Sequence, residues 1–485
     1  MSPIRSCGGG RWALRVITAL AAAHGALACG SSDGLTGGVA IDASGPGHLR
    51  DGAVTDAAAK GDGKTTNGAD ASADGGFCSG TGPVVQLPGS QGTYSICTSQ
   101  IASTLFENAL CTCDDAHIAG YLQTTAFNSL SGSDGGTSPT GAAVGINNAY
   151  SISAGYTHVG GSLSVAGSSS VAFIGYIETD GDLRLAGGAT IPGYTQVGRN
   201  GWLGGDFTDL GPTTVGGDLH HQGTVTAIPL SVGGANTSGP VTVTPPCPCG
   251  AKNILDVASI VAQGLASNDD KAVGLTPSSW TNVLVDQSVT LPCGQYYFDS
   301  IRIAGSLKIA VTGRVALFIG ADISVLGTLQ ITLGPTAQID IFVTNDLNLV
   351  GYAVFGDKAR PADTRIYVGG SGNVNLIGAG EFVGNVYAPL SLVTAPGYLD
   401  VYGSIFAKDF QIPGYADFNY DSAITQIGSN CPPVKIPGEC TQCGQCTNGL
   451  ACVAGKCGAC TADSDCCGQL VCTNGQCVPL LAPPK

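Results

Sequence analysis

Apolar and polar side chains alternate between Asp299 and Val350, and this pattern predicts the fold. Almost every apolar side chain falls on an odd-numbered position, from Ile301 to Leu349. Period two is typical of strands, because successive side chains of a strand point to opposite sides. Five glycines interrupt the pattern without moving the apolar side: Gly305, Gly313, Gly320, Gly327 and Gly334. The pattern predicts short strands coiled around a core, with odd positions buried and even positions exposed.

A second stretch, residues 145–245, repeats at solenoid spacing. Its recurring segments start 20, 20 and 16 residues apart, and tyrosines recur beside them at 156, 176 and 194. Because one coil cannot bury its own inner side, stacked coils share a core and equivalent side chains form ladders. Ladders of Leu and of Tyr are therefore expected. The segments are Gly161-Ser162-Leu163, Gly181-Asp182-Leu183, Gly201-Trp202-Leu203 and Gly217-Asp218-Leu219.

The later part of the chain repeats as well. Gly384-Asn385-Val386-Tyr387-Ala388 and Gly403-Ser404-Ile405-Phe406-Ala407 lie 19 residues apart. Pro-Gly-Tyr at 396–398 and 413–415 matches Pro-Gly-Tyr at 192–194. The run 381–421 resembles a domain of unknown function found in bacterial pilus-associated and surface-anchored proteins. The resemblance implies a β-solenoid at the cell surface and supplies no active site.

Two amphipathic helices are expected. Ser99 precedes apolar residues at helical spacing up to Leu110, and it is a suitable cap. A second apolar stripe runs from Ile254 to Leu265. Exposed β-edges pair with other chains unless they are covered, so this second helix is expected to cap an open solenoid end.

The predicted fold is mostly β, with one or two parallel β-helix (solenoid) modules, a few short helices and a small disulfide-rich C-terminal module. The two-module and one-module alternatives both fit the sequence. The expected segments are 1–28 (signal peptide), 29–77 (lipid anchor and disordered tether), 78–250 (first solenoid module with an N-terminal helix), 251–284 (helical cap and connector), 285–428 (second solenoid module) and 440–479 (cysteine-rich disulfide module).

Composition narrows the function classes. The chain has 485 residues, 74 glycines and a single methionine, which favours turn-rich β-structure over helical bundles. Only 11% of residues are charged, and the formal net charge is −15. An acidic surface repels phosphates, so nucleic acid is not expected as a partner.

The first 29 residues resemble the leader of an exported protein. Arg5, Arg11 and Arg15 flank or enter an apolar run, 12–28, that is too short to span a membrane. Ala26-Leu27-Ala28-Cys29 resembles a bacterial lipobox, which implies acylation of Cys29 and attachment to the outer membrane, at its surface or periplasmic face. The alternative is an ordinary signal peptide cleaved near residue 28. Residues 30–77 lack aliphatic clusters and are expected to form a flexible tether.

Cysteine usage agrees with export. Apart from Cys7 and Cys29, the chain has an even number of cysteines, which is typical of disulfides in an oxidising compartment. Cys97, Cys111 and Cys113 are expected to staple the first helix to the first module. The predicted disulfide-forming set is Cys78, Cys97, Cys111, Cys113, Cys247, Cys249, Cys293, Cys431, Cys440, Cys443, Cys446, Cys452, Cys457, Cys460, Cys466, Cys467, Cys472 and Cys477.

The tail contains 11 of these cysteines. Its spacing Cys446-x5-Cys452-x4-Cys457 is repeated by Cys467-x4-Cys472-x4-Cys477, and the order resembles a Dickkopf-type cysteine-rich module. So small a module needs cross-links, and its ten cysteines from 440 onward predict five internal bridges. Cys431 would then pair with one of the seven cysteines of the body. The alternative is zinc at Cys440-x2-Cys443 and Cys457-x2-Cys460.

Two groups of polar residues are candidates for chemistry, since paired carboxylates can act as acid and base. They are Asp206, Asp209, His220 and His221, and separately Asp357, Arg360, Asp363 and Arg365. We interpret the first group as solvated turn residues and the second as a surface loop with local ion pairs. No phosphate-binding, nucleophile-elbow or calcium-loop motif is present.

The sequence therefore predicts a non-enzymatic cell-surface lipoprotein with a structural, adhesive or partner-binding role. It would hold no cofactor or metal, and its partners would be the membrane and a protein or polysaccharide at the cell surface. The alternative is a secreted carbohydrate-active enzyme of β-helix fold, a polysaccharide lyase or a glycosidase.

Overall fold

The computed structural model of the protein describes residues 78, 84–89, 92–131, 141–169, 171–251, 253–378, 380–427, 450–453, 456–466, 470–473 and 476–479. The predicted signal peptide, Cys29 and the tether lie outside these residues and stay predictions. The same holds for Cys431, Cys440, Cys443, Cys446 and Cys467.

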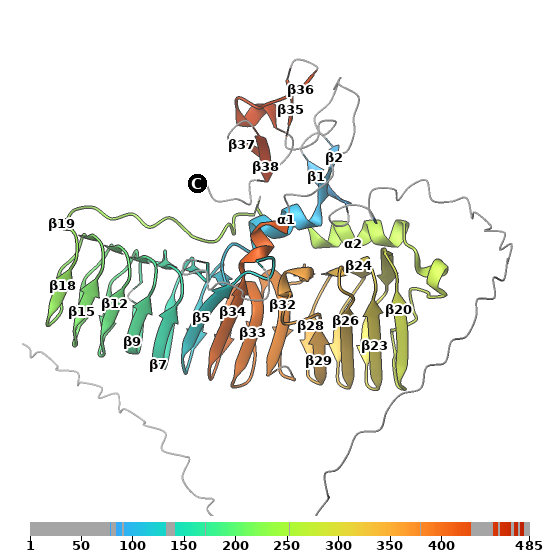
Figure 1. Ribbon diagram of the computed structural model, residues 1–485, viewed down its shortest axis with the longest axis horizontal. Coiled ribbons are helices and arrows are strands. Elements are labelled where there is room, and N and C mark those ends of the chain that lie inside the picture. The colour runs from blue at the N-terminus through green and yellow to red at the C-terminus, as the bar shows by residue number, and fades with distance from the viewer. Residues whose placement is uncertain are drawn as a thin grey trace, which may run out of the picture. The chain divides into compact units, whose positions relative to one another are not determined.

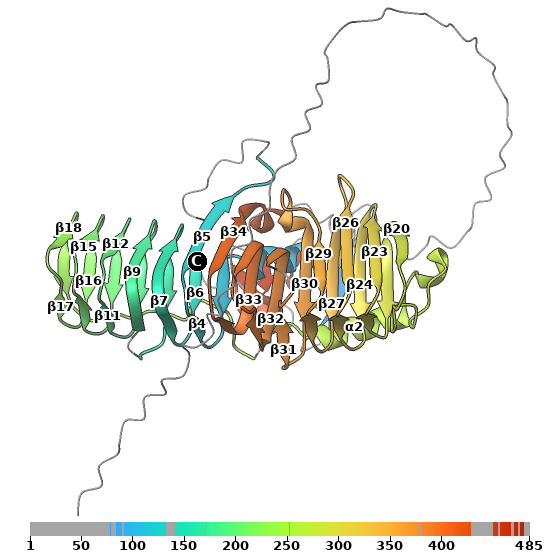
Figure 2. The same ribbon diagram turned by 90° about the horizontal axis from the view of Figure 1, so that it is seen from below.

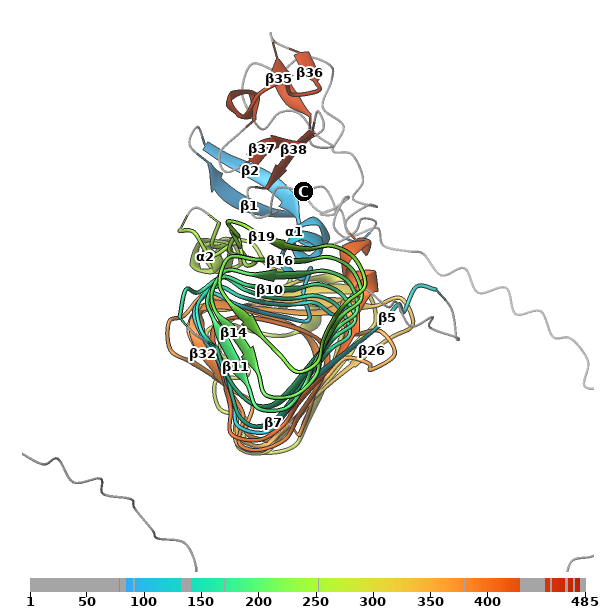
Figure 3. The ribbon, with the colours of Figure 1, turned by 90° about the vertical axis from the view of Figure 1, so that its left-hand side faces the viewer.

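The main body is a parallel β-solenoid, which confirms the predicted fold class. Each coil has a triangular cross-section, and its strands or strand segments lie on three faces (Figure 3). The odd-numbered apolar side chains of the second half fill the interior, as predicted: from Ile301 to Leu349 all are buried except the half-buried Ala321 and Leu333.

The first arm of the solenoid comprises β3 (Leu110–Thr112), β4 (Ala116–Ile118), β5 (Leu122–Phe127), β6 (Val144–Ile146), β7 (Tyr150–Val159), β8 (Leu163–Val165), β9 (Val171–Thr179), β10 (Leu183–Leu185), β11 (Ala189–Ile191), β12 (Thr195–Val197), β13 (Gly201–Leu203), β14 (Phe207–Asp209), β15 (Thr213–Val215), β16 (Leu219–His221), β17 (Val225–Thr226), β18 (Leu230–Val232) and β19 (Asn236–Ser238).

The second arm comprises β20 (Gln287–Leu291), β21 (Gly294–Phe298), β22 (Ile301–Ile303), β23 (Ser306–Val311), β24 (Arg314–Ile319), β25 (Ile323–Val325), β26 (Thr328–Leu333), β27 (Gln338–Val343), β28 (Leu347–Leu349), β29 (Tyr352–Phe355), β30 (Thr364–Val368), β31 (Asn373–Asn375), β32 (Glu381–Thr394), β33 (Leu399–Ile412) and β34 (Ala416–Asp421).

The two arms join into one solenoid whose middle contains the start of the first arm and the end of the second. β33 pairs in parallel with β3 and β4, and β34 pairs with β5. Figures 1 and 2 show the cyan β5 beside the orange β34. We call this contact the seam. Of the two alternatives that the sequence left open, the single continuous solenoid is the one observed.

Because of the seam, the chain starts in the middle, runs to one end and must return to the other. The return begins with residues 239–251, which we call the strap, and Figure 1 shows the strap running back above the first arm. Disulfides Cys111–Cys247 and Cys113–Cys249 attach it to β3 and to the residue that follows β3. These cysteines therefore staple the strap to the first coil, rather than the helix as we expected.

The registers confirm both repeats and correct one. Gly384 lies opposite Gly403, and Ala388 opposite Ala407. In the first arm, however, Gly201 pairs with Leu183 on one side and with Leu219 on the other. The second and third spacings are therefore both 18 residues and not the 20 and 16 expected. The segment Gly201-Trp202-Leu203 resembles the repeat but is two positions out of register with it. Gly201 occupies an inward position that leucine holds in the neighbouring coils.

Helix α1 (Thr98–Leu105) is shorter than predicted. The helix was expected to reach Leu110, but Leu110 begins β3 and pairs with Ile405 across the seam. The amide of Ala109 donates to the carbonyl of Ala143 in the next coil. Backbone pairing in the solenoid therefore ends the helix before its apolar pattern does. Before α1 the chain forms an antiparallel hairpin of β1 (Val84–Gly89) and β2 (Gly92–Cys97).

Helix α2 (Val257–Ala266) confirms the second predicted helix but not its place. It packs across β21, β24 and β27, along the side of three coils, and does not cover an end. Gly264 permits this close approach, since a Cβ there would lie 2.2 Å from the Phe318 ring. The 3-10 helices are η1 (Asp270–Val273), η2 (Pro361–Asp363), η3 (Ser422–Thr425) and η5 (Asp463–Asp465).

The helices explain why the expectation for even positions is wrong on this side of the sheet. Ala316, Phe318, Asp340 and Phe342 are buried although they point away from the solenoid interior. Rings at such positions stack from Phe318 through Phe342 to Tyr367, with centroids 5.5 and 4.8 Å apart. The sheet here separates two apolar layers, whereas the sequence pattern predicted one.

The C-terminal part contains two short antiparallel hairpins. They are formed by β35 (Ala451–Val453) with β36 (Lys456–Gly458), and by β37 (Leu470–Thr473) with β38 (Gln476–Pro479). Cys452 lies opposite Cys457 in the first hairpin, and Cys472 opposite Cys477 in the second. The cysteine repeat expected from the sequence therefore corresponds to two equivalent hairpins.

Candidate functional site

The first group of candidate residues makes structural contacts, some between neighbouring coils and some within one coil. Asp206 Oδ1 accepts from the amide of Thr224 in the next coil at 2.8 Å. Asp209 is buried, and it accepts from the amide of Gly211 at 2.9 Å and from the hydroxyl of Thr213 at 2.9 Å. We interpreted Asp209 as a solvated turn residue, and its burial corrects that interpretation.

The two histidines also make local contacts. His220 lies 2.7 Å from the Thr237 hydroxyl and stacks on Trp202, and His221 lies 2.7 Å from the carbonyl of Gly223. Among the described residues, no hydrogen bond or ion pair joins either ring to Asp206 or Asp209. The structure therefore does not gather these four residues into an acid–base pair across a groove.

The second group is divided between surface and core. Arg360 and Asp363 form the expected local ion pair at 3.0 Å, and Asp357 accepts from the amide of Ala359. Arg365, however, is fully buried in β30, which contradicts the surface-loop interpretation. Burial opposes its charge, but the adjacent Asp340 holds the pKa of Arg365 above its ordinary value.

The contacts of Arg365 explain its burial. Its Nε and Nη2 donate to the two carboxylate oxygens of Asp340 at 2.6 and 3.0 Å, and Nη1 donates to the carbonyl of Ala362. Thr98 of α1 donates to the same carboxylate at 2.9 Å. This bidentate pair fixes the helix to the sheet and has no access to solvent.

A row of carboxylates that the sequence analysis missed lies on the outer side of β32, β33 and β34. Glu381 pairs in register with Asp400, and Asp400 with Asp417. Equivalent side chains on adjacent parallel strands are about 4.8 Å apart. Lys358 forms an ion pair with Glu381 and lies 4.9 Å from the centre of the Tyr402 ring. We call Glu381, Asp400 and Asp417 the carboxylate row.

The row has unusual titration properties. Partial burial, and then the neighbouring Glu381, raise the pKa of Asp400, while Lys358 and the amide of Asn419 oppose the rise. Partial burial, and then Asp400, raise the pKa of Asp417. Asp417 Oδ1 is buried without a hydrogen-bond partner among the described residues. Neighbouring carboxyl groups with raised pKa values are a feature of acid–base sites as well as of structural rows.

A sequence signal could have found part of the row. In Pro396-Gly397-Tyr398 and Pro413-Gly414-Tyr415, the residue two positions after each tyrosine is an aspartate, Asp400 or Asp417. The aspartates of this repeat are as regular as its tyrosines. The in-register placement of both aspartates follows from the 17-residue spacing, which is one coil.

The tyrosines form the predicted ladder, and the ladder crosses the seam. Tyr415 of the second arm stacks on Tyr121 of the first, with ring centroids 4.3 Å apart. Tyr156, Tyr176 and Tyr194 continue the stack at 4.8, 4.9 and 4.6 Å. The ring stack therefore reinforces the contact between the two arms.

Residues 255–427 match the family described as "Domain of unknown function (DUF7305)". The match includes the run 381–421 on which the resemblance was based. No curated protein and no solved structure matches the chain.

The DUF7305 region has clear limits in the structure. It comprises α2, the connector after it and the whole second arm, and it ends at η3, directly after the strand that pairs with β5 across the seam. The carboxylate row and the Asp340–Arg365 pair lie within it. The first arm, the Asp206 group and the C-terminal hairpins lie outside it. No helix among the described residues is long and apolar enough to cross a membrane.

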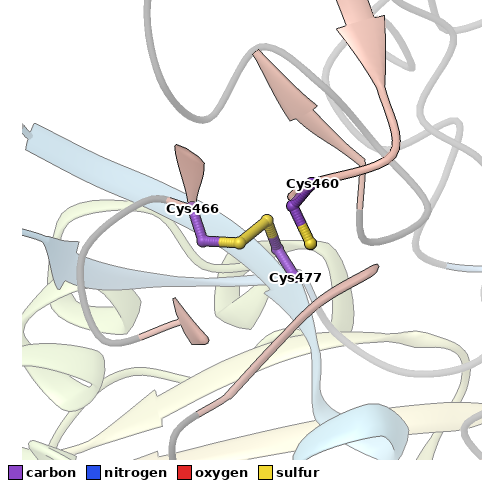
Figure 4. Close-up of side chains that lie close together, drawn as sticks. All are labelled: Cys460, Cys466 and Cys477. Carbon is purple, nitrogen blue, oxygen red and sulfur yellow. A yellow bond between two sulfur atoms is a disulfide. The ribbon is translucent and has the colours of Figure 1, made fainter. Parts of the chain in front are cut away.

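Outside the DUF7305 region, cysteines gather in the C-terminal part. The sulfurs of Cys460, Cys466 and Cys477 lie within 4.8 Å of one another, a spacing that resembles a metal site. All three sulfurs form disulfides, however, in the bridges Cys460–Cys472 and Cys466–Cys477. Figure 4 shows the second bond with the Cys460 sulfur beside it. Cys460, which the zinc alternative requires as a thiolate, is therefore bridged.

The bridges of the body leave one specific prediction. Cys78–Cys293, Cys111–Cys247 and Cys113–Cys249 pair six of its seven cysteines with each other. The expected partner of Cys431, which lies outside the described residues, is then Cys97. Peptide mapping of the non-reduced mature protein should find this bridge and no free thiol. A bridge from Cys431 to any residue between 440 and 477 would contradict the prediction.

Proposed function

We propose that the protein is an exported lipoprotein of the bacterial outer membrane that presents a rigid solenoid and a disulfide-rich module to a partner at the cell surface. Acylated Cys29 and the tether would hold the solenoid at the membrane. The role is structural or adhesive, and the partner is a protein or a polysaccharide. The C-terminal module, residues 440–479, is the proposed contact.

One observation carries the proposal: disulfides join segments of the solenoid body that are far apart in the sequence. Cys78–Cys293 connects the first described residue to the second arm, and two further bridges attach the strap to the first coil. Each bridge closes a loop of more than a hundred residues, with separations of 215, 136 and 136. Disulfides of this kind persist in oxidising compartments, which supports export.

The solenoid itself supports a presenting role. Its polar side chains on coil edges are used to join coils: Asp182 accepts from the amide of Asn200, Asn200 from that of Asp218, and Asp218 from that of Ala235. A body of this construction is rigid along its length. Rigid scaffolds carry function on the segments that they position.

Replacing Cys29 with serine tests the anchor. A lipoprotein held by two or more acyl chains stays with the membrane, whereas an unacylated chain has no such hold. We expect Cys29→Ser to move the protein from the membrane fraction to the soluble fraction, measured by fractionation and immunoblotting. Cys7→Ser is the matched control and should change nothing. Retention of Cys29→Ser in the membrane would contradict the lipoprotein proposal.

Removing residues 440–479 tests the presenting role. Binding of the purified mature protein to cells of its own species and to surface polysaccharides should be lost in the shortened chain. Its thermal unfolding should not change, because the described bridges of this part, Cys460–Cys472 and Cys466–Cys477, stay within it and join the segment between the hairpins to the second hairpin. Equal binding by the shortened chain would remove the C-terminal module from the proposal.

The alternative, a carbohydrate-active enzyme, is favoured by one observation, the carboxylate row. Adjacent carboxyl groups, one acting as acid and the other as nucleophile, can cleave a glycosidic bond. If so, the mature protein should release sugars from a polysaccharide, and Asp400→Asn and Asp417→Asn should abolish release. Asp286→Asn, at an exposed position, is the control. Absence of turnover against a broad polysaccharide panel would remove this alternative.

The raised pKa of Asp417 gives a stability prediction that holds under either function. A pKa raised in the folded state means that ionisation costs folding free energy at pH values above that pKa. Asp417→Asn should therefore stabilise the protein at pH 7, and the gain should disappear as pH falls through the folded pKa toward 3.8, the ordinary pKa of an aspartate. Thermal melts of both proteins across this range measure it. A gain that does not depend on pH would contradict the assignment.

A further inference from the structure

The two ends of the solenoid differ in whether a segment of the chain covers the outermost strands. At the second-arm end, residues 268–286 lie over the first coil and bond to its strand edge. Asp269 accepts from the amide of Gln295 at 2.8 Å, and Asp270 accepts from the amide of Tyr297 at 3.0 Å. This connector, rather than α2, is the cap that the sequence analysis expected. We call this end the capped end.

Side chains complete the cap. Trp280 is buried and stacks on Phe298 with ring centroids 3.9 Å apart, and its carbonyl accepts from the amide of Arg302. Val283 exchanges backbone hydrogen bonds with β22 and its following residue, accepting from Ala304 and donating to Arg302. A dedicated segment therefore satisfies the outer edges of β21 and β22, which would otherwise pair with another chain. The third strand of this coil, β20, pairs with β23 only.

The first-arm end has no such segment among the described residues. β17, β18 and β19 each pair with one neighbouring strand only, β14, β15 and β16 respectively. Figure 3 views this end directly, and no helix lies across its outermost coil. All three residues of β19 are exposed, and Leu230 and Val232 of β18 are only half-buried. We call this end the open end.

The open end also lacks the charges that usually protect a β-edge. From Leu219 to residue 251 the sequence contains no Asp, Glu, Lys or Arg, although the chain as a whole is acidic. The two large apolar side chains near this end, Leu210 and Ile228, are 70% and 79% exposed. Natural edges are commonly blocked with lysine or other charges. An uncharged edge suits a contact between two identical surfaces. In a two-fold symmetric contact, a charge near the axis lies close to the same charge on the other copy, and the two repel.

We propose that the open end binds the open end of a second copy of this chain, forming a two-fold symmetric dimer. A two-fold axis through the face of β19 places β19 against the partner's β19, antiparallel, and places β17 against the partner's β18. The seam gives a precedent inside the molecule, since there the edges of β33 and β34 already join a coil that is remote in sequence. The cap over β21 and β22 hinders the same contact at the other end, which favours a pair over a longer assembly.

Lysine substitutions test the proposal on the full mature chain. Ile228→Lys and Ser238→Lys, made singly, place positive charges that meet their own copies across the two-fold axis. Each should weaken dimerisation roughly a hundredfold, since like charges juxtaposed at an interface cost several kcal/mol. Thr190→Lys and Thr332→Lys are the matched controls, because they add the same charge at exposed positions away from the open end. Sedimentation velocity over roughly 1–100 µM protein covers the affinity range of interest.

The expected result is a dimer for the unmodified protein and both controls, and monomers for both open-end variants with unchanged melting temperature. Three results would overturn the proposal: a monomeric unmodified protein over the whole range, a dimer that the open-end variants leave intact, or assemblies larger than a dimer. The test does not involve Cys29 or residues 440–479, so its outcome is independent of the proposed function.

Discussion

Removing either partner of the buried Asp340–Arg365 pair should destabilise the protein by about 3–5 kcal/mol, because the remaining charge would be buried without compensation. Both side chains are fully buried, and the Arg365 guanidinium binds the carboxylate through two nitrogens. Denaturant unfolding of Asp340→Ala and Arg365→Ala measures the loss. The loss should include weaker docking of α1, since Thr98 donates to the same carboxylate.

The double variant Asp340→Leu with Arg365→Met distinguishes a charge effect from a packing effect. Replacing both partners with apolar side chains leaves no buried charge, so the double variant should be more stable than either single variant. The exposed pair Lys358–Glu381 is the control, and removing Glu381 should cost less than about 1 kcal/mol. Additive losses in the double variant would contradict the interpretation of Asp340 and Arg365 as one coupled pair.

The solenoid could be predicted from the sequence because the alternation of apolar and polar residues within each strand determines which side chains fill the interior. Odd-numbered residues from Ile301 to Leu349 face inward whatever lies outside the coil, so period two was enough to find them. The Tyr ladder followed in the same way from its spacing. Neither inference required knowledge of which segments meet across the sequence.

The remaining features depend on contacts between segments far apart in the sequence, which no local pattern contains. Arg365 looks like a surface residue until α1 covers it, with Thr98 donating to Asp340 from 242 positions away. The seam joins Leu110 to Ile405, and nothing at either residue indicates it. Gly201 shows the converse error, since a segment that looked like the repeat was two positions out of register.

The carboxylate row lies between these cases. Its residues recur one coil apart, so the repeat could have placed Asp400 beside Asp417. The pKa of Asp400 is raised by partial burial and by the charge of Glu381, and the pKa of Asp417 by partial burial and by the charge of Asp400. Both effects depend on the packed surface. The sequence repeat therefore predicts which residues of a solenoid lie side by side on one face. The pKa values of those residues depend on side chains from other coils, which the repeat does not predict.

The register of the second arm predicts a large difference between adjacent positions. Ile331 is buried and stacks in register with Ile309, whereas Thr332 is exposed on the outer side of the same strand. Ile331→Asp should cost at least about 4 kcal/mol, because it removes a core side chain and places an unpaired carboxyl in an apolar interior. Thr332→Asp should stay within about 0.5 kcal/mol, as most exposed substitutions do.

Thermal and denaturant unfolding of the two variants, with Ile331→Val as an intermediate, measure this difference. Ile331→Val keeps the apolar surface and should lose only about 0.5–1.5 kcal/mol, which separates the effect of lost volume from that of the buried carboxyl. Because a slip of one residue would exchange the two sides of the strand, the order of losses reports the register directly. Equal losses for Ile331→Asp and Thr332→Asp would mean that the strand does not hold one side inward, and the stacked-coil architecture of the second arm would then be wrong.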